Sequence, residues 1–152
     1  MLIYTCLEEG RVLPYEVLEG IVKNGCDLML TTNKEFPPSD KYKAQNIQRL
    51  LKDFKDDYFI FIDSDVVMTD KDTITKMKLA LTYNPIVTVP TKPGHIKANF
   101  PDVMPHAICG IRSDYIDIFK FYLKTDGCTY CNFLKVHQPA VLWDLQAYEL
   151  KK

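Results

Sequence analysis

Apolar residues along the first ninety positions alternate between short continuous runs and longer stretches with helical spacing. Short apolar runs rich in β-branched and aromatic residues are typical of strands that are buried in a parallel sheet. Four such runs occur: Leu2 to Cys6, Asp27 to Thr32, Tyr58 to Ile62 and Ile86 to Val89. Because helical stretches separate them, the order β-α-β-α-β-α-β predicts an α/β fold with a mostly parallel sheet and helices on both faces.

Three amphipathic helices are predicted between these strands. The first begins near Pro14 and ends at Asn24, the second begins at Ser39 or Asp40, and the third opens near Thr69. Their inward-facing residues, in chain order, are Val17, Leu18, Ile21 and Val22; Ala44, Ile47, Leu50, Leu51 and Phe54; and Ile74, Met77 and Leu81.

The remainder of the chain is less regular. Residues 90–105 contain four prolines and a glycine, which predicts a surface loop rather than a long element. The elements predicted after this loop are a strand from Ala107 to Ile111, a helix from Ser113 to Leu123, a short helix from Asp126 to Val136, a strand from Ala140 to Trp143 and a frayed tail.

Composition and charge place the chain among ordinary globular proteins. Its 152 residues are 47% apolar and 26% charged, with a formal net charge of -1, so one domain with a substantial core is expected. No stripe of lysine and arginine suggests a nucleic-acid partner. The N-terminus does not resemble a signal peptide and no segment is long enough to span a membrane, so we expect a cytoplasmic protein.

The five cysteines do not suggest a disulfide framework, because their number is odd and no secretion signal is seen. Cys128 and Cys131 have the C-x₂-C spacing of zinc and redox sites, with Cys109 and His137 as the obvious further ligands. A second C-x₂-C pair is missing, so cysteines that face a core are the favoured interpretation.

The strand from Tyr58 to Ile62 runs directly into Asp63, Ser64 and Asp65. Ligands of open α/β sheets bind outside the carboxyl ends of the strands, and residues two apart in an extended segment point the same way. Two close carboxylates repel unless a cation lies between them, and oxygen ligands suit Mg²⁺ or Mn²⁺. The triplet therefore predicts a divalent metal that bridges substrate phosphates, although the same residues also favour a plain turn.

This arrangement resembles the GT-A fold glycosyltransferases, and in particular the large inverting family that uses nucleotide-diphosphate sugars. The resemblance rests on the helical segment from Leu18 to Asn24, on the helix that carries Asn46, and on the strand that ends in Asp63-Ser-Asp65. It implies a three-layer α/β/α fold in one domain, with residues 1–90 as the nucleotide-sugar-binding half and 91–152 as the acceptor-side half. It also implies that the triplet is the Asp-x-Asp motif, with Asp65 on a Mn²⁺ or Mg²⁺ ion and Asp63 on the ribose or a metal-bound water.

The resemblance implies further site residues. The segment that begins at Asp126 looks like the helix start that bears the catalytic base, although an aspartate there is equally suited to cap a helix. Asp144 stands where a histidine sometimes completes metal coordination, so the predicted metal ligands are Asp63, Asp65 and Asp144. The predicted substrate contacts are Thr5, Arg11, Asn33, Asn46 and Asp63.

The predicted function is therefore metal-dependent transfer of a sugar from a nucleotide-diphosphate sugar to a glycan, protein or lipid acceptor, with inversion. One alternative is a nucleotidyltransferase of related architecture. That class usually has a glycine-rich loop after the first strand, and the segment from Glu8 to Arg11 has a single glycine. Another alternative is a catalytically silent domain that binds a nucleotide sugar.

Overall fold

The computed structural model of the chain describes residues 1–8, 10–33, 40–92, 107–123 and 129–150. Their strands are β1 (Leu2–Glu8), β2 (Asp27–Asn33), β3 (Tyr58–Ile62), β4 (Val66–Met68), β5 (Ile86–Thr88), β6 (Thr91–Lys92), β7 (Ile108–Arg112), β8 (Ala140–Val141) and β9 (Ala147–Glu149). Their helices are α1 (Tyr15–Lys23), α2 (Asp40–Leu51), α3 (Thr73–Leu81), the 3₁₀ turn η1 (Ser113–Tyr115), α4 (Ile116–Tyr122) and α5 (Thr129–Val136).

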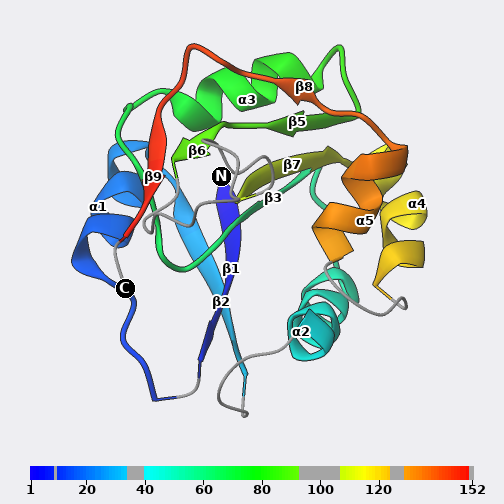
Figure 1. Cartoon of the computed structure of the whole chain (residues 1–152), viewed down its shortest axis with the longest axis horizontal. Helices are drawn as coiled ribbons and strands as arrows, with labels where there is room; N and C mark the ends of the chain where they lie inside the picture. Colours follow the sequence, from blue (N-terminus) through cyan, green and yellow to red (C-terminus); the bar gives the residue numbers. More distant parts are fainter. Residues whose placement is uncertain (9, 34–39, 93–106, 124–128, 151–152) are drawn as a thin grey trace, which may run out of the picture.

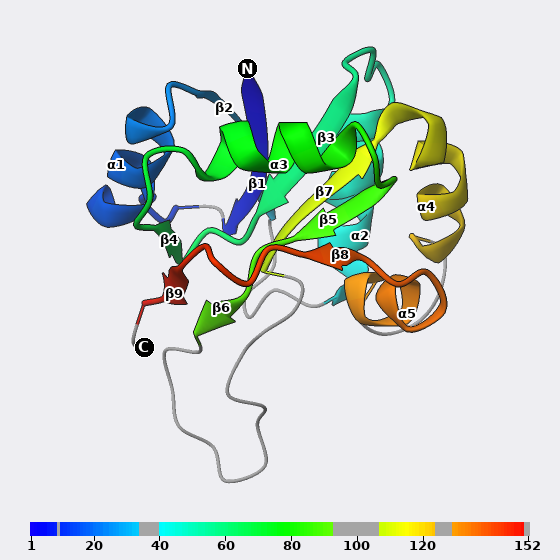
Figure 2. The ribbon, with the colours of Figure 1, turned by 90° about the horizontal axis from the view of Figure 1, so that it is seen from above.

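A six-stranded sheet with the order β2-β1-β3-β7-β5-β8 forms the middle layer (Figure 1). All of its neighbouring strands are parallel except β7, which runs antiparallel to both β3 and β5. Helices α1 and α3 cover one face, and α2, α4 and α5 cover the other (Figure 2). The predicted three-layer α/β/α architecture with a mostly parallel sheet is confirmed.

The register of the parallel strands brings several carboxyl ends to one edge of the sheet. Strand β1 pairs with β2 along its whole length and with β3 at Tyr4 and Phe61. Because the strands are parallel, this pairing places Cys6 level with Asp63, the residue that follows β3. The end of β1 and the Asp-Ser-Asp triplet therefore lie side by side.

Each face of the sheet has its own core. On strand β3, Ile60 and Ile62 point toward α1 and α3 and join an aliphatic cluster, whereas Phe59 and Phe61 point toward α2, α4 and α5. All four side chains are fully buried, and the alternation follows from the two-residue period of a strand. We call the two sides the aliphatic face and the aromatic face.

A second, three-stranded sheet with the order β4-β9-β6 was not predicted. The prediction of a frayed tail is wrong, because Ala147–Glu149 form β9, which pairs with β4 and β6. The third helix begins at Thr73 rather than near Thr69, because residues 69–72 form a bend and a turn between β4 and the helix. Strands of two or three residues are too short to produce a periodic pattern, so only their distant pairing reveals them.

The two predicted halves of the chain share one sheet. Strand β7 comes from the half at 91–152 and lies between β3 and β5 of the half at 1–90. Close packing holds it there, because a Cβ atom on Gly110 would lie 3.0 Å from Leu81 Cδ1 and 3.2 Å from Met77 Cε. Glycine at this position lets α3 approach the middle of the sheet.

Candidate active site

The Asp-Ser-Asp triplet forms a turn between β3 and β4 at the carboxyl edge of the sheet. The backbone N–H of Asp63 donates to Ala107 O at 3.0 Å, and Val66 N–H donates to Asp63 O at 3.1 Å. Leu150 N–H donates to Asp65 O at 2.8 Å. The triplet is thus not an extension of the strand, so the expectation that both carboxylates point the same way by strand period does not apply. The backbone is instead held from both sides by residues distant in sequence.

Lys43 supplies a cation to this turn. Its Nζ lies 2.6 Å from Asp63 Oδ1, and the two side chains are only 28% and 20% exposed. The same ammonium lies 5.3 Å from the ring centroid of Phe61 and 5.6 Å from that of Tyr130. An ion pair that is partly shielded and flanked by aromatic rings is stronger than an exposed pair, because less water screens it.

Lys43 was missed in the sequence, although a signal for it exists. It lies four residues before Ile47 and seven before Leu50, which places it on the inward stripe of α2. A lysine at a position where the pattern expects an apolar residue indicates a buried counter-charge, because a charged side chain is rarely taken into a core without a partner.

Cys6 lies beside the Lys43–Asp63 pair. Its Sγ is 3.2 Å from Thr31 Oγ1 on β2. Burial raises the pKa of the Cys6 thiol above its ordinary value, while the hydrogen bond with Thr31 and the charges of Lys43 and Arg49 partly oppose that shift. Cys6 is therefore a neutral thiol at physiological pH, and it contributes a weakly polar wall to the site.

The predicted substrate contacts occupy different environments. Thr5 and Asn46 are 0% and 1% exposed, and within the described residues the Thr5 hydroxyl has no hydrogen-bond partner. Arg49 Nη2 donates to Asn46 Oδ1 on the same helix. Arg11 is exposed after β1, and Asn33 ends β2 opposite Glu8. Contact of these residues with a substrate stays a prediction.

Asp144 lies away from the helices of the aromatic face. Its carboxylate is 73% exposed and lies 3.8 Å from Lys76 Nζ on α3. Among the residues that the structure describes, no group of three Cys, His, Asp or Glu side chains could hold a metal ion, so Asp144 does not join Asp63 and Asp65 in such a group. Its role as a third ligand stays a prediction. The second sheet instead brings Glu149, which is 8% exposed, opposite Val66, next to Asp65.

Asp126, the predicted catalytic base, falls at 124–128, outside the described residues. The helix that follows it, α5, begins at Thr129. The ring of Tyr130, in the first turn of this helix, lies 5.6 Å from the ring of Phe61. The start of α5 therefore lies beside the Lys43–Asp63 pair.

His137 is engaged by two tyrosines rather than by cysteines. Tyr115 Oη lies 2.7 Å from its Nδ1, and Tyr122 Oη lies 3.0 Å from its Nε2. Cys131 lies on α5 as a reduced thiol, and Cys128 lies outside the described residues. Both ring nitrogens of His137 therefore already have partners on the aromatic face.

No family model and no curated protein sequence matches the chain. Solved structures do match it. A197 from STIV has a TM-score of 0.70 at 13% identity, over 100% of this chain and 87% of that one. A glycosyltransferase involved in the glycosylation of the major capsid of PBCV-1 has a TM-score of 0.55 at 14% identity, over 92% and 81% of the two chains. The 4-diphosphocytidyl-2C-methyl-D-erythritol synthase from Anaerococcus prevotii has a TM-score of 0.55 at 10% identity, over 95% and 87%.

These likenesses define the class of fold. The chain has a GT-A-like fold, the three-layer architecture of nucleotide-diphospho-sugar transferases, and the predicted fold class is thereby confirmed. Within the described part of the chain, no helix is long and apolar enough to cross a membrane.

Proposed function

We propose that the chain is a glycosyltransferase that moves a sugar from a nucleotide-diphosphate sugar to a glycan, protein or lipid acceptor. The observation that carries the proposal is the position of Asp63 and Asp65, which follow β3 at the carboxyl edge of a GT-A-like sheet with Lys43 at 2.6 Å from Asp63. This edge is where open α/β sheets bind their ligands. The likeness to a glycosyltransferase over most of both chains supports the same conclusion.

The donor set of the turn suits Mg²⁺ or Mn²⁺. These ions are commonly held by one or two carboxylates together with substrate phosphates, so a third protein ligand is not required. Asp65 would hold the ion, with Asp63 on the ion or on the ribose. A bound ion would act as a Lewis acid on the diphosphate oxygens.

The protein's own groups have separate tasks in this proposal. Lys43 offsets the negative charge of Asp63 and adds a positive charge beside the position of the diphosphate, where charge increases as the sugar leaves. Asp126 accepts the proton of the acceptor hydroxyl as that oxygen attacks the anomeric carbon, which inverts the configuration. The position of Tyr130 and the start of α5 against Phe61 supports a base from this segment.

A nucleotidyltransferase is the second candidate, because a likeness to a synthase of a diphosphocytidyl compound covers most of the chain. The connection between β1 and α1 argues against it. Only Gly10 interrupts this segment, with a φ of 83°, whereas a cradle for a triphosphate usually needs several glycines whose backbone N–H groups face the phosphates.

One assay separates the two candidates by the product they release. The protein is incubated with Mn²⁺ and either nucleotide-diphosphate sugars or nucleoside triphosphates with sugar 1-phosphates, and the release of nucleoside diphosphate or of pyrophosphate is followed. We expect nucleoside diphosphate from one nucleotide sugar, through transfer or slow hydrolysis. Pyrophosphate release would support the nucleotidyltransferase instead. Tight binding of a nucleotide sugar without any product would indicate a silent domain.

A further inference from the structure

A hollow lined by polar side chains and by Leu51 lies beside α2. It has a volume of about 700 Å³ and is open to solvent between α2 and α4. Sites for small ligands usually have volumes of about 300–1,000 Å³. The described residues that line this groove are Gln45, Gln48, Arg49, Leu51, Lys52 and Lys120.

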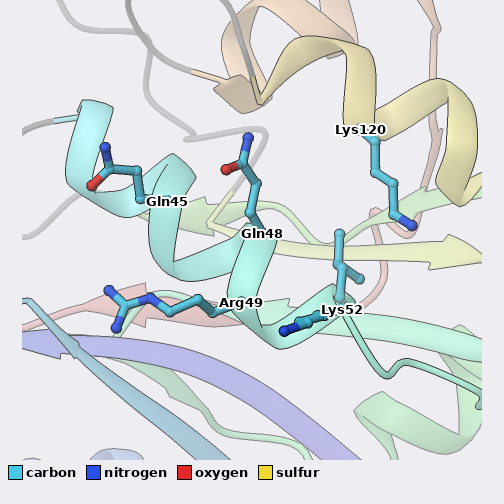
Figure 3. A pocket seen from close by; sticks show the side chains of 6 residues that line it. Gln45, Gln48, Arg49, Lys52 and Lys120 are labelled. Atoms are coloured by element: carbon cyan, nitrogen blue, oxygen red, sulfur yellow. The ribbon is translucent and has the colours of Figure 1, made fainter.

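Helical spacing explains how one helix serves two sites. Gln45, Gln48, Arg49 and Lys52 follow one another at i, i+3, i+4 and i+7, so they share the outer side of α2. Lys43 lies two residues before Gln45, on the inward side. Figure 3 shows Gln45 and Arg49 on one flank of α2, and Gln48 and Lys52 nearer α4, which carries Lys120. Leu51, which is buried, also lines the groove.

The groove is positively charged although the chain as a whole is balanced. Three of its six described lining residues are cations and none is a carboxylate. Among described residues, Arg49 and Lys52 form no ion pair, and Arg49 donates only to the neutral amide of Asn46. Lys120 has a loose contact at 3.9 Å with Asp117, whose carboxylate is almost fully exposed. The groove thus retains most of its positive charge.

The charge changes sign at one end of the groove, which limits the length of a ligand. Beyond Lys120 and Leu51 the surface continues into a smaller hollow of about 230 Å³, where Asp56, Asp57 and Asp117 outnumber Lys55 and Lys120. These carboxylates would repel an anionic chain that extended past Lys120. The groove therefore favours a compact anion over a long polyanion that would extend past Lys120.

We propose that the α2–α4 groove is a second anion-binding site, for a compact ligand that carries more than one phosphate group. The guanidinium of Arg49 donates to Asn46 through Nη2, and its remaining N–H groups can donate to one phosphate. The ammonium groups of Lys52 and Lys120 supply positive charge for another. The amide of Gln45 is a neutral donor, and so is the amide of Gln48, whose Nε2 also donates to Leu123 O at 3.4 Å. The proposal does not depend on the function of the Asp-Ser-Asp turn.

Tripolyphosphate is the probe that tests this site, by calorimetric titration in buffer without metal ions. We expect binding that weakens as salt is raised, because exposed charges are screened. Lys52→Gln and Lys120→Gln should each weaken the binding by about fivefold, the upper range for one exposed ion pair, and the double variant by about 25-fold. The matched control is Lys78→Gln, an exposed lysine on α3, which should bind as the wild type does.

Two further measurements complete the test. Arg49→Lys keeps the positive charge but loses the several N–H donors of the guanidinium, so this variant should bind tripolyphosphate more weakly than the wild type does. Phosphatidylcholine vesicles that contain phosphatidylinositol 4,5-bisphosphate, whose headgroup carries more than one phosphate, distinguish the source of the phosphates. If the vesicles bind the wild type but not the double variant, the phosphates belong to a lipid. If the wild type binds tripolyphosphate but not the vesicles, the phosphates belong to a soluble ligand. The proposal would be overturned if the wild type and the double variant bound tripolyphosphate equally well. It would also be overturned if Lys78→Gln lost as much affinity as Lys52→Gln or Lys120→Gln. Both outcomes are independent of the result for nucleotide sugars.

Discussion

The two faces of the central sheet are built from the same strands but carry different side chains. On the aliphatic face, Ile60 and Ile62 pack against α1 and α3. On the aromatic face, Phe59 and Phe61 pack against rings from α4 and α5, and Lys43 lies above Phe61 on its way to Asp63. Lys43 of the candidate donor site and the cations of the α2–α4 groove both belong to the aromatic side.

This difference follows from what each kind of side chain tolerates. Aliphatic side chains pack densely and offer nothing to a buried charge, so the aliphatic face is suited to stability alone. Aromatic rings present a negative π-face that attracts an ammonium group, so Lys43 can reach Asp63 across a hydrophobic layer. We therefore expect substitutions on the aliphatic face to change stability only, and substitutions on the aromatic face to change ligand binding as well.

The largest expected effect is on the rate of sugar transfer, and it follows a substitution of Asp63 at the carboxyl end of β3. Asp63→Asn keeps the shape of the side chain but removes the charge that Lys43 and a metal ion would share. We expect transfer to fall by at least about a hundredfold, the usual effect of losing one group that stabilises charge in a transition state. Steady-state kinetics measures it. Asp27→Asn, an exposed aspartate at the opposite end of the sheet, is the control, and an equal loss there would contradict the assignment.

The second-largest expected effect is on the free energy of unfolding, and it follows a substitution on the aliphatic face. A Cβ atom on Gly20 would lie 2.8 Å from the backbone oxygen of Met68, so Gly20→Ala forces α1 away from β4. We expect the free energy of unfolding to fall by about 1–3 kcal/mol, as measured by urea denaturation. The folded variant should bind a nucleotide sugar with unchanged affinity. Weakened binding in the folded state would show that the two faces are coupled.

Two neighbouring residues on β3 sharpen the comparison. Ile60→Val and Phe61→Leu both alter fully buried side chains and should each lower the free energy of unfolding by about 1 kcal/mol. Only Phe61→Leu removes one of the two rings beside Lys43, and we expect it alone to weaken donor binding by about threefold to fivefold. Calorimetric titration at matched folded fractions measures this. Equal donor affinity in the two variants would mean that the ring contributes packing and no more.

The smallest effect concerns Tyr4 and pH. Burial, together with the hydrogen bond from the Tyr4 hydroxyl to Asp56 at 3.1 Å, raises the pKa of Tyr4 from 10.0 to about 12. The neutral phenol is the form that the fold favours. Its contribution to stability is therefore complete below pH 10 and is lost as the pH rises from 10 through 12.

Tyr4→Phe should lower the free energy of unfolding by about 0.5–1.5 kcal/mol at neutral pH. The difference in the free energy of unfolding between the wild type and the variant should become smaller above pH 10. Chemical denaturation at a series of pH values measures both quantities, and a gap that stays constant to pH 12 would contradict the assignment.

Much of this architecture could be predicted from local pattern. The strand at Tyr58 to Ile62 and the acidic residues that follow it were identifiable because a buried strand has a continuous apolar run and its end tends to be polar. Strands β4 and β9 could not be predicted, because each has three residues and is stabilised by pairing with a segment distant in sequence.

The candidate site was predicted less completely than the fold. Asp63 and Asp65 were identifiable from their position after a strand, but Lys43 belongs to a helix whose inward stripe is otherwise largely apolar. The turn geometry of the triplet also depends on a hydrogen bond from Leu150 to Asp65, at the other end of the chain. Contacts between distant segments leave no local pattern, so side-chain partners of this kind emerge only from the fold.

Binding of a nucleotide sugar at the Asp-Ser-Asp turn is the central claim, and thermal unfolding tests it most directly. The wild type and Asp65→Asn are unfolded with UDP, GDP and their common sugars, each with and without Mn²⁺. At a ligand concentration of about 100 times Kd, binding adds about 2.7 kcal/mol, or roughly 5–10 °C in Tm for a chain of this size. We predict such a rise for one nucleotide in the wild type, only with Mn²⁺, and none in Asp65→Asn. No rise with any nucleotide, or the same rise in both proteins, would contradict the claim.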